Sequence, residues 1–90
     1  MDSDLDVRRR RAIYRAQHRG TKEMDLILGR FAEARVPTMG ADVLGRFEAL
    51  LALPDPDLQN AVLVGGAIGP AELHSFFDEL RGFHGLAVGK

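Results

Sequence analysis

Apolar residues between Met24 and Ala32 recur with the period of an α-helix. They occupy positions 24, 27, 28, 31 and 32, which is the i, i+3, i+4, i+7, i+8 pattern of one helical face, without a break. A helix of this kind must bury its apolar face against another element. Because no stretch of the 90-residue chain reads as a convincing strand, we expect the partners to be helices as well.

Four further helical segments are separated by prolines and glycines. The five predicted helices span residues 6–19, 21–35, 41–53, 55–64 and 70–84. We therefore expect one all-α domain, a compact five-helix bundle over residues 6–84, with flexible segments at 1–5 and 85–90. Beyond the first pattern, the apolar faces place these residues in the core: Leu44, Phe47, Leu50, Leu51, Leu73, Phe76, Phe77 and Leu80.

Residues that favour helix ends mark the first two helices. Asp4 or Asp6 is expected to be the N-cap of the first helix, and Gly20 to follow its end in the left-handed conformation. Thr21 is the expected N-cap of the second helix, which Pro37 ends.

The fourth helix begins with an N-cap signal at Asp55, followed by Pro56 in the first helical turn. Gly65 and Gly66 close it. Its apolar stripe is little more than Leu58 and Val62, so this helix is expected to be the least stable of the five.

Charge is distributed unevenly along the chain. Residues 1–35 hold nine Lys and Arg against six Asp and Glu, whereas residues 36–90 hold three against seven. Four arginines at i, i+3, i+7 and i+11 lie along one stripe of the first helix: Arg8, Arg11, Arg15 and Arg19. Such a dipolar molecule indicates a partner that is contacted by one end.

The sequence contains few candidate groups for enzymatic chemistry. The chain has no cysteine, and His18, His74 and His84 lack the spacing of metal ligands. The glycines of 65–69 lack the preceding strand and the spacing of a phosphate-binding loop. We expect no enzyme, no bound metal and no cofactor of the chain's own.

Nothing in the sequence predicts a membrane helix, because no apolar run approaches the ~20 residues required. The acidic start of the chain does not resemble a secretory or transit peptide, which leaves the bacterial cytoplasm or an already processed organelle protein, and we expect the bacterial cytoplasm. The run from Arg8 to Arg11 leaves a second interpretation open, a nucleic-acid-binding or antitoxin-like regulatory module that grips phosphates. No base-reading helix follows that run, and the net charge of −1 does not favour it.

The segment 19–26, Arg-Gly-Thr-Lys-Glu-Met-Asp-Leu, gathers most of the chemical groups into one turn. Local structure alone explains it in part, because Thr21 caps a helix whose first turn favours the anions Glu23 and Asp25. The segment also resembles the R-G-x-x-E-x-D motif of the flavinylation and assembly factors of succinate dehydrogenase. The similarity extends over about residues 8–82 and includes the Asp-Pro-Asp-Leu block at 55–58.

This resemblance implies a monomeric assembly factor that binds the flavoprotein subunit of succinate dehydrogenase, and possibly that of fumarate reductase. The factor would promote covalent attachment of FAD to a histidine of that client, and the FAD would belong to the client. The residues expected to contact the client are Arg11, Arg15, Arg19, Gly20, Glu23 and Asp25. The chain departs from the family at Gln17, Gln59 and Ala61, where aromatic residues are common.

Overall fold

The computed structural model describes residues 4–85, and within this range the chain forms helices and no strand. The α-helices are α1 (Asp4–Gln17), α2 (Lys22–Arg35), α3 (Ala41–Leu51), α4 (Asp55–Val64) and α5 (His74–Phe83). Two short 3-10 helices, η1 (Val36–Thr38) and η2 (Ala71–Leu73), follow α2 and precede α5. The predicted all-α, five-helix fold is confirmed.

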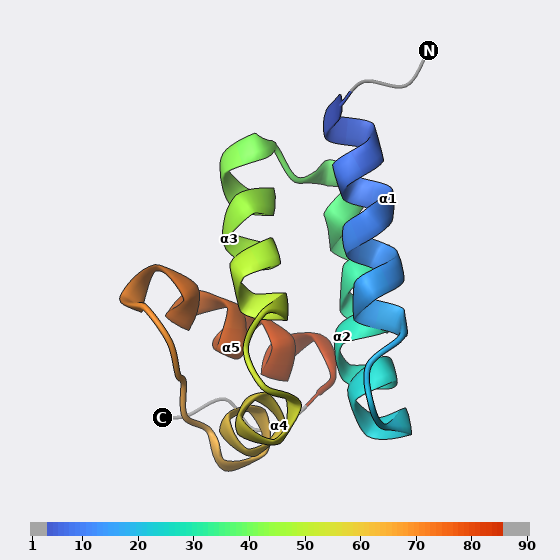
Figure 1. Cartoon of the computed structure of the whole chain (residues 1–90). Coiled ribbons are helices and arrows are strands. Elements are labelled where there is room, and N and C mark those ends of the chain that lie inside the picture. Colours follow the sequence, from blue (N-terminus) through green and yellow to red (C-terminus); the bar gives the residue numbers. More distant parts are fainter. Residues whose placement is uncertain (1–3, 86–90) are drawn as a thin grey trace.

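α1 and α2 lie side by side as a helical hairpin, and α3 packs along α1 (Figure 1). α5 crosses below α3 and packs against α2 and α4. α4 lies at the lower end of α3, near the turn between α1 and α2. This arrangement brings two connections that are distant in sequence, α1–α2 and α3–α4, to the same end of the molecule.

Three of the buried phenylalanine rings lie together in the core, and the partly buried Phe83 packs against this cluster. Phe31 of α2 meets Phe47 of α3 at a centroid distance of 5.9 Å and Phe83 of α5 at 5.7 Å, and it faces Phe76 edge-on at 6.5 Å. The predicted core residues are all buried except Ile27, which is partly buried against the cluster. Other buried residues between the helices include Val36, Met39 and Leu58.

The ends of α1 differ from the sequence-based prediction. The helix begins at Asp4, so Asp4 and Asp6 lie in its first turn and neither is the N-cap. Asp6 instead accepts a hydrogen bond from Arg9 at 2.8 Å. Asp4 and Leu5 therefore belong to α1 rather than to a flexible segment, while residues 1–3 and 86–90 lie outside the described part of the chain.

The prediction of a left-handed Gly20 was wrong. Positive φ angles within residues 4–85 occur at Gly65, Gly69 and Gly85, and Gly20 is not among them. The physical reason is that α1 ends at Gln17, so Gly20 does not follow the helix directly. Thr21 does cap α2, since its side chain accepts from the Met24 N–H.

Both ends of the α3–α4 connection also shift. α3 ends at Leu51, two residues early, and the N-cap of α4 is Pro54 rather than Asp55. The Asp55 carboxylate is directed away from its own helix, toward the α1–α2 turn. The end of α4 was predicted correctly: Gly65 has φ 88°, and the N–H groups of Gly65 and Gly66 both bond to the Ala61 carbonyl.

A buried arginine that the sequence did not reveal attaches α4 to α5. Arg81 is 3% exposed, and its Nη1 donates to the carbonyl oxygens of Ala61 at 3.1 Å and Gly66 at 2.8 Å. Its Nη2 donates to Asp78 at 2.6 Å. The Ala61 carbonyl also accepts from the N–H groups of Gly65 and Gly66, so Arg81 adds a charged donor at the C-terminal end of α4 and connects the following loop to α5.

We expect the amide protons of α4 to exchange faster than those of α2. α4 buries three side chains, Leu58, Ala61 and Val62, and leaves Val64 70% exposed, whereas α2 buries five residues. A smaller buried apolar area lowers the free energy of local opening, by at least ~1 kcal/mol here. Native-state hydrogen exchange measures this, and equal protection of the two helices would contradict it.

Candidate partner-binding site

The α1–α2 turn, residues 18–21, has no regular secondary structure and is held by side chains from elsewhere in the fold. Arg19 provides most of this attachment. Its Nε donates to Asp55 Oδ1 at 2.8 Å, its Nη1 to the Leu51 carbonyl at 2.8 Å and its Nη2 to the Leu53 carbonyl at 3.2 Å. The Arg19 side chain is 11% exposed, so its guanidinium is largely enclosed by these acceptors.

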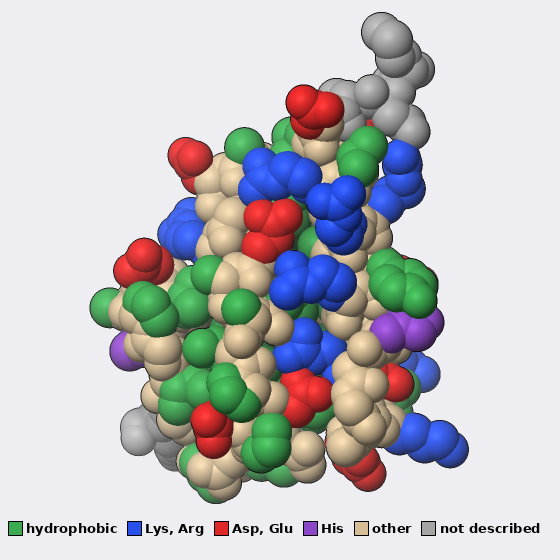
Figure 2. Space-filling view, viewed as in Figure 1, with side chains coloured by type: hydrophobic (Ala, Val, Ile, Leu, Met, Phe, Trp, Pro, Cys, Tyr) green, Lys and Arg blue, Asp and Glu red, His purple; other side chains and the backbone are tan. Residues whose placement is uncertain are grey.

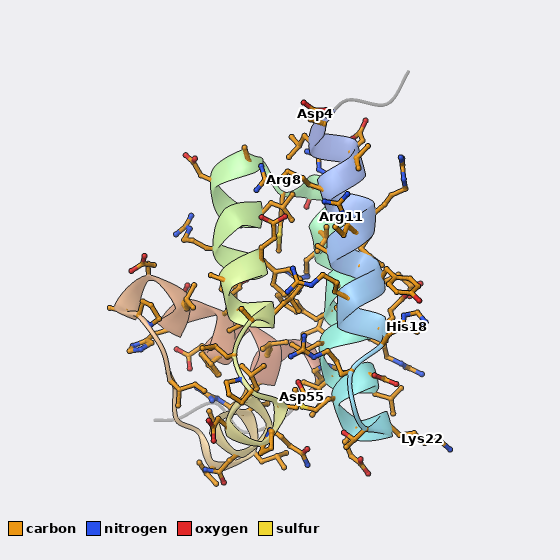
Figure 3. All side chains as sticks on the ribbon, in the orientation of Figure 1. Asp4, Arg8, Arg11, His18, Lys22 and Asp55 are labelled. Atoms are coloured by element: carbon orange, nitrogen blue, oxygen red, sulfur yellow. The ribbon has the colours of Figure 1, made fainter. Side chains whose placement is uncertain are left out.

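Two carboxylates bind the backbone of the turn. Asp25 accepts from the Arg19 N–H, and Asp55 Oδ2 accepts from the Gly20 N–H at 3.0 Å. We call Arg19, Gly20, Asp55 and the carbonyl groups of Leu51 and Leu53 the Arg19–Asp55 cluster. It joins the α1–α2 turn to the α3–α4 connection, and Figure 3 shows Asp55 directed toward the turn.

The outer surface of the turn carries Lys22 and Glu23. Both side chains are exposed, and neither forms a hydrogen bond or ion pair with any residue between 4 and 85. Figure 3 shows Lys22 extending away from the body of the molecule. Leu26, one turn later on α2, is 52% exposed and extends the same surface with apolar area. Glu23 is therefore an exposed carboxylate without a polar partner among residues 4–85, and it lies in the first turn of α2, directly after the anchored α1–α2 turn.

The arginine stripe of α1 runs along its contact with α3. Figure 2 shows a column of basic side chains there with acidic ones between them. At the upper end Arg8 forms an ion pair with Glu48 at 2.8 Å, and at the lower end Arg19 is paired with Asp55. Arg11 and Arg15 between them are exposed, and within residues 4–85 no acidic side chain pairs with them directly.

The run Arg8–Arg11 does not form one basic patch. Arg8 is paired with Glu48, whereas Arg9 donates to Asp6 and, twice, to the Met39 carbonyl. Two of the four guanidiniums of this run are therefore engaged in contacts within the fold. The arrangement does not support the alternative prediction of a nucleic-acid-binding module.

Two carboxylates of this region have lowered pKa values. Burial would raise the pKa of Asp55, but hydrogen bonds from Gly20 and Arg19 outweigh it and lower the pKa. The hydrogen bond from Arg8 lowers the pKa of Glu48 against desolvation, and the charges of Arg15 and Arg11 add to this.

We expect the free energy of unfolding to decrease as the pH falls below about 4.5. The ordinary pKa values of Asp55 and Glu48 are 3.8 and 4.5, and both are lowered in the folded state. Their stabilisation is therefore complete above the unfolded pKa values and is lost as the pH falls through the folded ones. Urea unfolding between pH 6 and about pH 3 measures the effect. In the double variant Asp55→Asn, Glu48→Gln, the free energy of unfolding should decrease less steeply as the pH falls. A decrease as steep as in the wild-type protein would contradict the assignment to these two carboxylates.

Each of the three histidines contacts a backbone carbonyl of the fold. His74 contacts the Gly69 carbonyl at 2.9 Å, His84 contacts the Ile27 carbonyl at 2.7 Å, and His18 contacts the Tyr14 carbonyl at 2.8 Å. Among the described residues no three His, Cys, Asp or Glu side chains are grouped as metal ligands. None of the described helices is long and apolar enough to cross a membrane.

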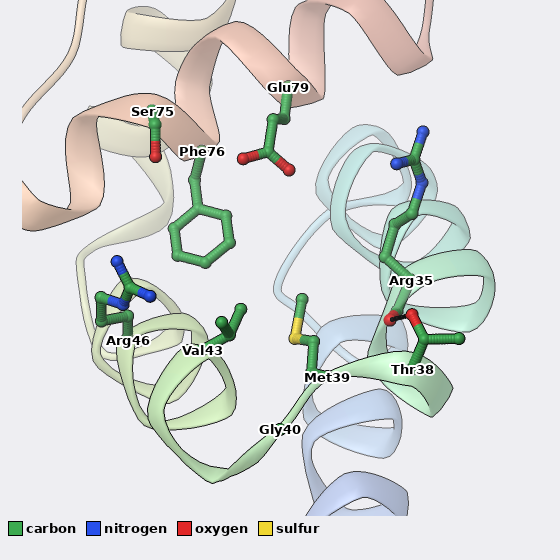
Figure 4. Close-up of a pocket in the computed structure, with 9 residues that line it drawn as sticks. All are labelled: Arg35, Thr38, Met39, Gly40, Val43, Arg46, Ser75, Phe76 and Glu79. Atoms are coloured by element: carbon green, nitrogen blue, oxygen red, sulfur yellow. Dashed lines mark hydrogen bonds between the residues drawn. The ribbon is translucent and has the colours of Figure 1, made fainter.

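An open hollow of about 300 Å³ lies between η1, α3 and α5 (Figure 4). Met39, Val43 and Phe76 provide its apolar lining, with Arg46 and Glu79 among its polar residues. It shares no residue with the α1–α2 turn, and we assign it no role.

The fold and the site define a small helical protein that presents an anchored, charged turn on its surface. A family model described as flavinator of succinate dehydrogenase matches residues 10–84, and the chain belongs to this family. This finding confirms the resemblance predicted from the motif. No solved structure matches the chain significantly.

Curated relatives come from bacteria and eukaryotes. The FAD assembly factor SdhE of Acetobacter pasteurianus is 47% identical over 59 residues, which cover 66% of this chain and 54% of the relative. The mitochondrial succinate dehydrogenase assembly factor 2 of Komagataella phaffii is 42% identical over 53 residues, covering 59% and 28%. That of Dictyostelium discoideum is 34% identical over 61 residues, covering 68% and 43%. The matched part of this chain thus spans about half or less of each relative's length.

Proposed function

We propose that this chain is an assembly factor that binds the flavoprotein subunit of succinate dehydrogenase and promotes covalent attachment of FAD to it. Family membership and the names of the relatives support this function. The structural observation that carries it is the free carboxylate of Glu23, exposed on a turn that the Arg19–Asp55 cluster fixes. An exposed charge on a rigid support is well suited to pair with a partner's cation or N–H group.

In this proposal the contact residues fall into two groups. Glu23, Arg11 and Arg15 touch the client, since all three are exposed and without a direct ionic partner between residues 4 and 85. Arg19 and Asp25 contribute mainly by holding the turn in place. The Arg19 side chain binds the Leu51 carbonyl, and Asp25 binds the Arg19 N–H. Gly20 lacks a side chain at an exposed position, which lets the client's backbone come close.

The chemistry would remain with the client. A histidine of the flavoprotein subunit forms the bond to the flavin, and this chain contributes orientation and electrostatics without a cofactor or catalytic residue of its own. We extend the proposal to the flavoprotein subunit of fumarate reductase as a second client. We also propose that the factor acts as a monomer in the bacterial cytoplasm.

Reconstitution tests the proposed function. The purified apo flavoprotein subunit is mixed with FAD in the presence and absence of this protein, and covalent flavin is followed as fluorescence in a denaturing gel. We expect the protein to increase the rate of attachment and to co-elute with the subunit. Equal rates with and without it would overturn the proposal. Bovine serum albumin at the same concentration controls for nonspecific stabilisation of the subunit.

A further inference from the structure

We propose that Asp55 is a positioning residue for partner binding, which holds the α1–α2 turn in the conformation that presents Glu23. The inference rests on the proposed function and adds a residue from a distant part of the sequence to its site. Asp55 lies 35 positions after Gly20 in the sequence, yet its carboxylate binds the turn directly.

Both oxygens of this carboxylate are used. Oδ1 accepts from the Arg19 guanidinium, and Oδ2 accepts from the Gly20 N–H at 3.0 Å. One side chain thereby fixes two consecutive residues of the turn, one through its side chain and one through its backbone. Pro54 and Pro56 flank Asp55 and restrict its backbone, so the carboxylate is attached to a stiff support.

Arg19 and Asp25 hold other parts of the turn, but the Gly20 backbone is held by this contact with Asp55. Residues 18–21 have no helical hydrogen-bond pattern, and glycine has more conformational freedom than any other residue. Glu23 follows Gly20 by three positions, in the first turn of α2. Loss of the bond to Gly20 would leave the start of α2 free to move relative to α1. Binding of the client would then have to order it, which lowers affinity.

A second ion pair, between α1 and α3, provides a matched comparison. Arg8 and Glu48 join α1 to α3, whereas Arg19 and Asp55 join the α1–α2 turn to the start of α4, and the two carboxylates are similarly exposed, 28% against 22%. Within residues 4–85, Glu48 accepts hydrogen bonds from Arg8 and from no residue of the turn. If Asp55 acted only through stability, the two pairs would be equivalent for client binding.

The test therefore compares Asp55→Asn with Glu48→Gln, at a temperature at which circular dichroism shows each variant fully folded. Asp57→Asn changes an exposed residue of α4, the helix that contains Asp55, and serves as a third variant. The affinity for the purified apo flavoprotein subunit is measured by titration. We expect Asp55→Asn to weaken binding about tenfold or more and the other two variants to stay within about twofold. Amide exchange at Gly20 should accelerate in Asp55→Asn and stay unchanged in Glu48→Gln.

A double variant separates positioning from a direct contact. If Asp55 acts by presenting Glu23, the combination with Glu23→Ala should weaken binding by clearly less than the product of the single effects. Fully multiplicative effects, or equal losses in Asp55→Asn and Glu48→Gln, would overturn the inference while leaving the proposed function intact. Wild-type protein that does not bind the subunit would overturn the proposed function itself. Unchanged exchange at Gly20 in Asp55→Asn would disprove the positioning without reference to any client.

Discussion

Replacing Glu23 by alanine is expected to remove most of the flavinylation activity while leaving the fold intact. The carboxylate is exposed and pairs with nothing between residues 4 and 85, so its loss breaks no internal contact. Its interaction with the N-terminal dipole of α2 is worth a few tenths of a kcal/mol. In a complex, the loss would leave a client cation or N–H group unpaired, which costs about 2–4 kcal/mol of binding, on the order of a hundredfold in affinity.

The measurement is the fluorescence of covalent flavin on the client subunit in a denaturing gel, together with a thermal melt of the variant. Lys22→Ala is the matched control, because Lys22 is the neighbouring residue and is equally exposed and unpaired among the described residues. It occupies a variable position of the motif and should reduce flavinylation far less. If both variants support normal flavinylation, Glu23 serves only its own helix and the assignment of the contact is wrong.

Local patterns in the sequence were sufficient to predict the helices. The period from Met24 to Ala32 reappears as the buried face of α2, and the glycines at 65 and 66 end α4 as expected. These features depend on residues within one or two turns of each other, which is the range over which helix propensity and capping act. The same range explains the correct prediction that Thr21 caps α2.

The roles of the motif residues could not be predicted locally, because they depend on contacts between distant segments. The sequence predicts Asp55 as an N-cap, since aspartate before proline is a common helix start. Its carboxylate instead binds Arg19, 36 positions earlier in the sequence, and Gly20, 35 positions earlier. Arg81 is not part of the apolar stripe of α5, yet it is buried against carbonyl groups of Ala61 and Gly66. An arginine at the end of an apolar stripe, opposite a glycine-rich loop, is a signal that could have suggested this contact.

The departures from the family at three positions have a simple structural setting. Gln17 lies where α1 and α2 approach closely, since a Cβ at Gly29 would be 3.0 Å from its Cγ. Ala61 is buried beneath Arg81, and Gln59 is half-buried on α4. Small or flexible side chains at these sites are compatible with the packing of this chain.

Among alanine substitutions of the motif residues, Arg19→Ala is expected to cause the largest loss of stability. The substitution removes the donor for the Leu51 and Leu53 carbonyls and leaves the Asp55 carboxylate, 22% exposed, without its cation. Breaking a buried ion pair from one side costs about 3–5 kcal/mol, and the remaining exposure of Asp55 reduces this to about 2–4 kcal/mol. Urea unfolding followed by circular dichroism measures the difference.

Two further variants identify the cause of that loss. Arg19→Lys keeps the charge but presents a single ammonium in place of the planar fork that reaches three acceptors, so it should restore less than half of the lost stability. Arg15→Ala removes an exposed arginine from the nearby end of α1 and should change the free energy of unfolding by less than about 0.5 kcal/mol. Because Arg19 and Asp55 act on each other, adding Asp55→Asn to Arg19→Ala should cost much less than it does in the wild-type protein. Additive losses would show that the two residues stabilise the fold independently, and the Arg19–Asp55 cluster would then not be the unit that fixes the turn.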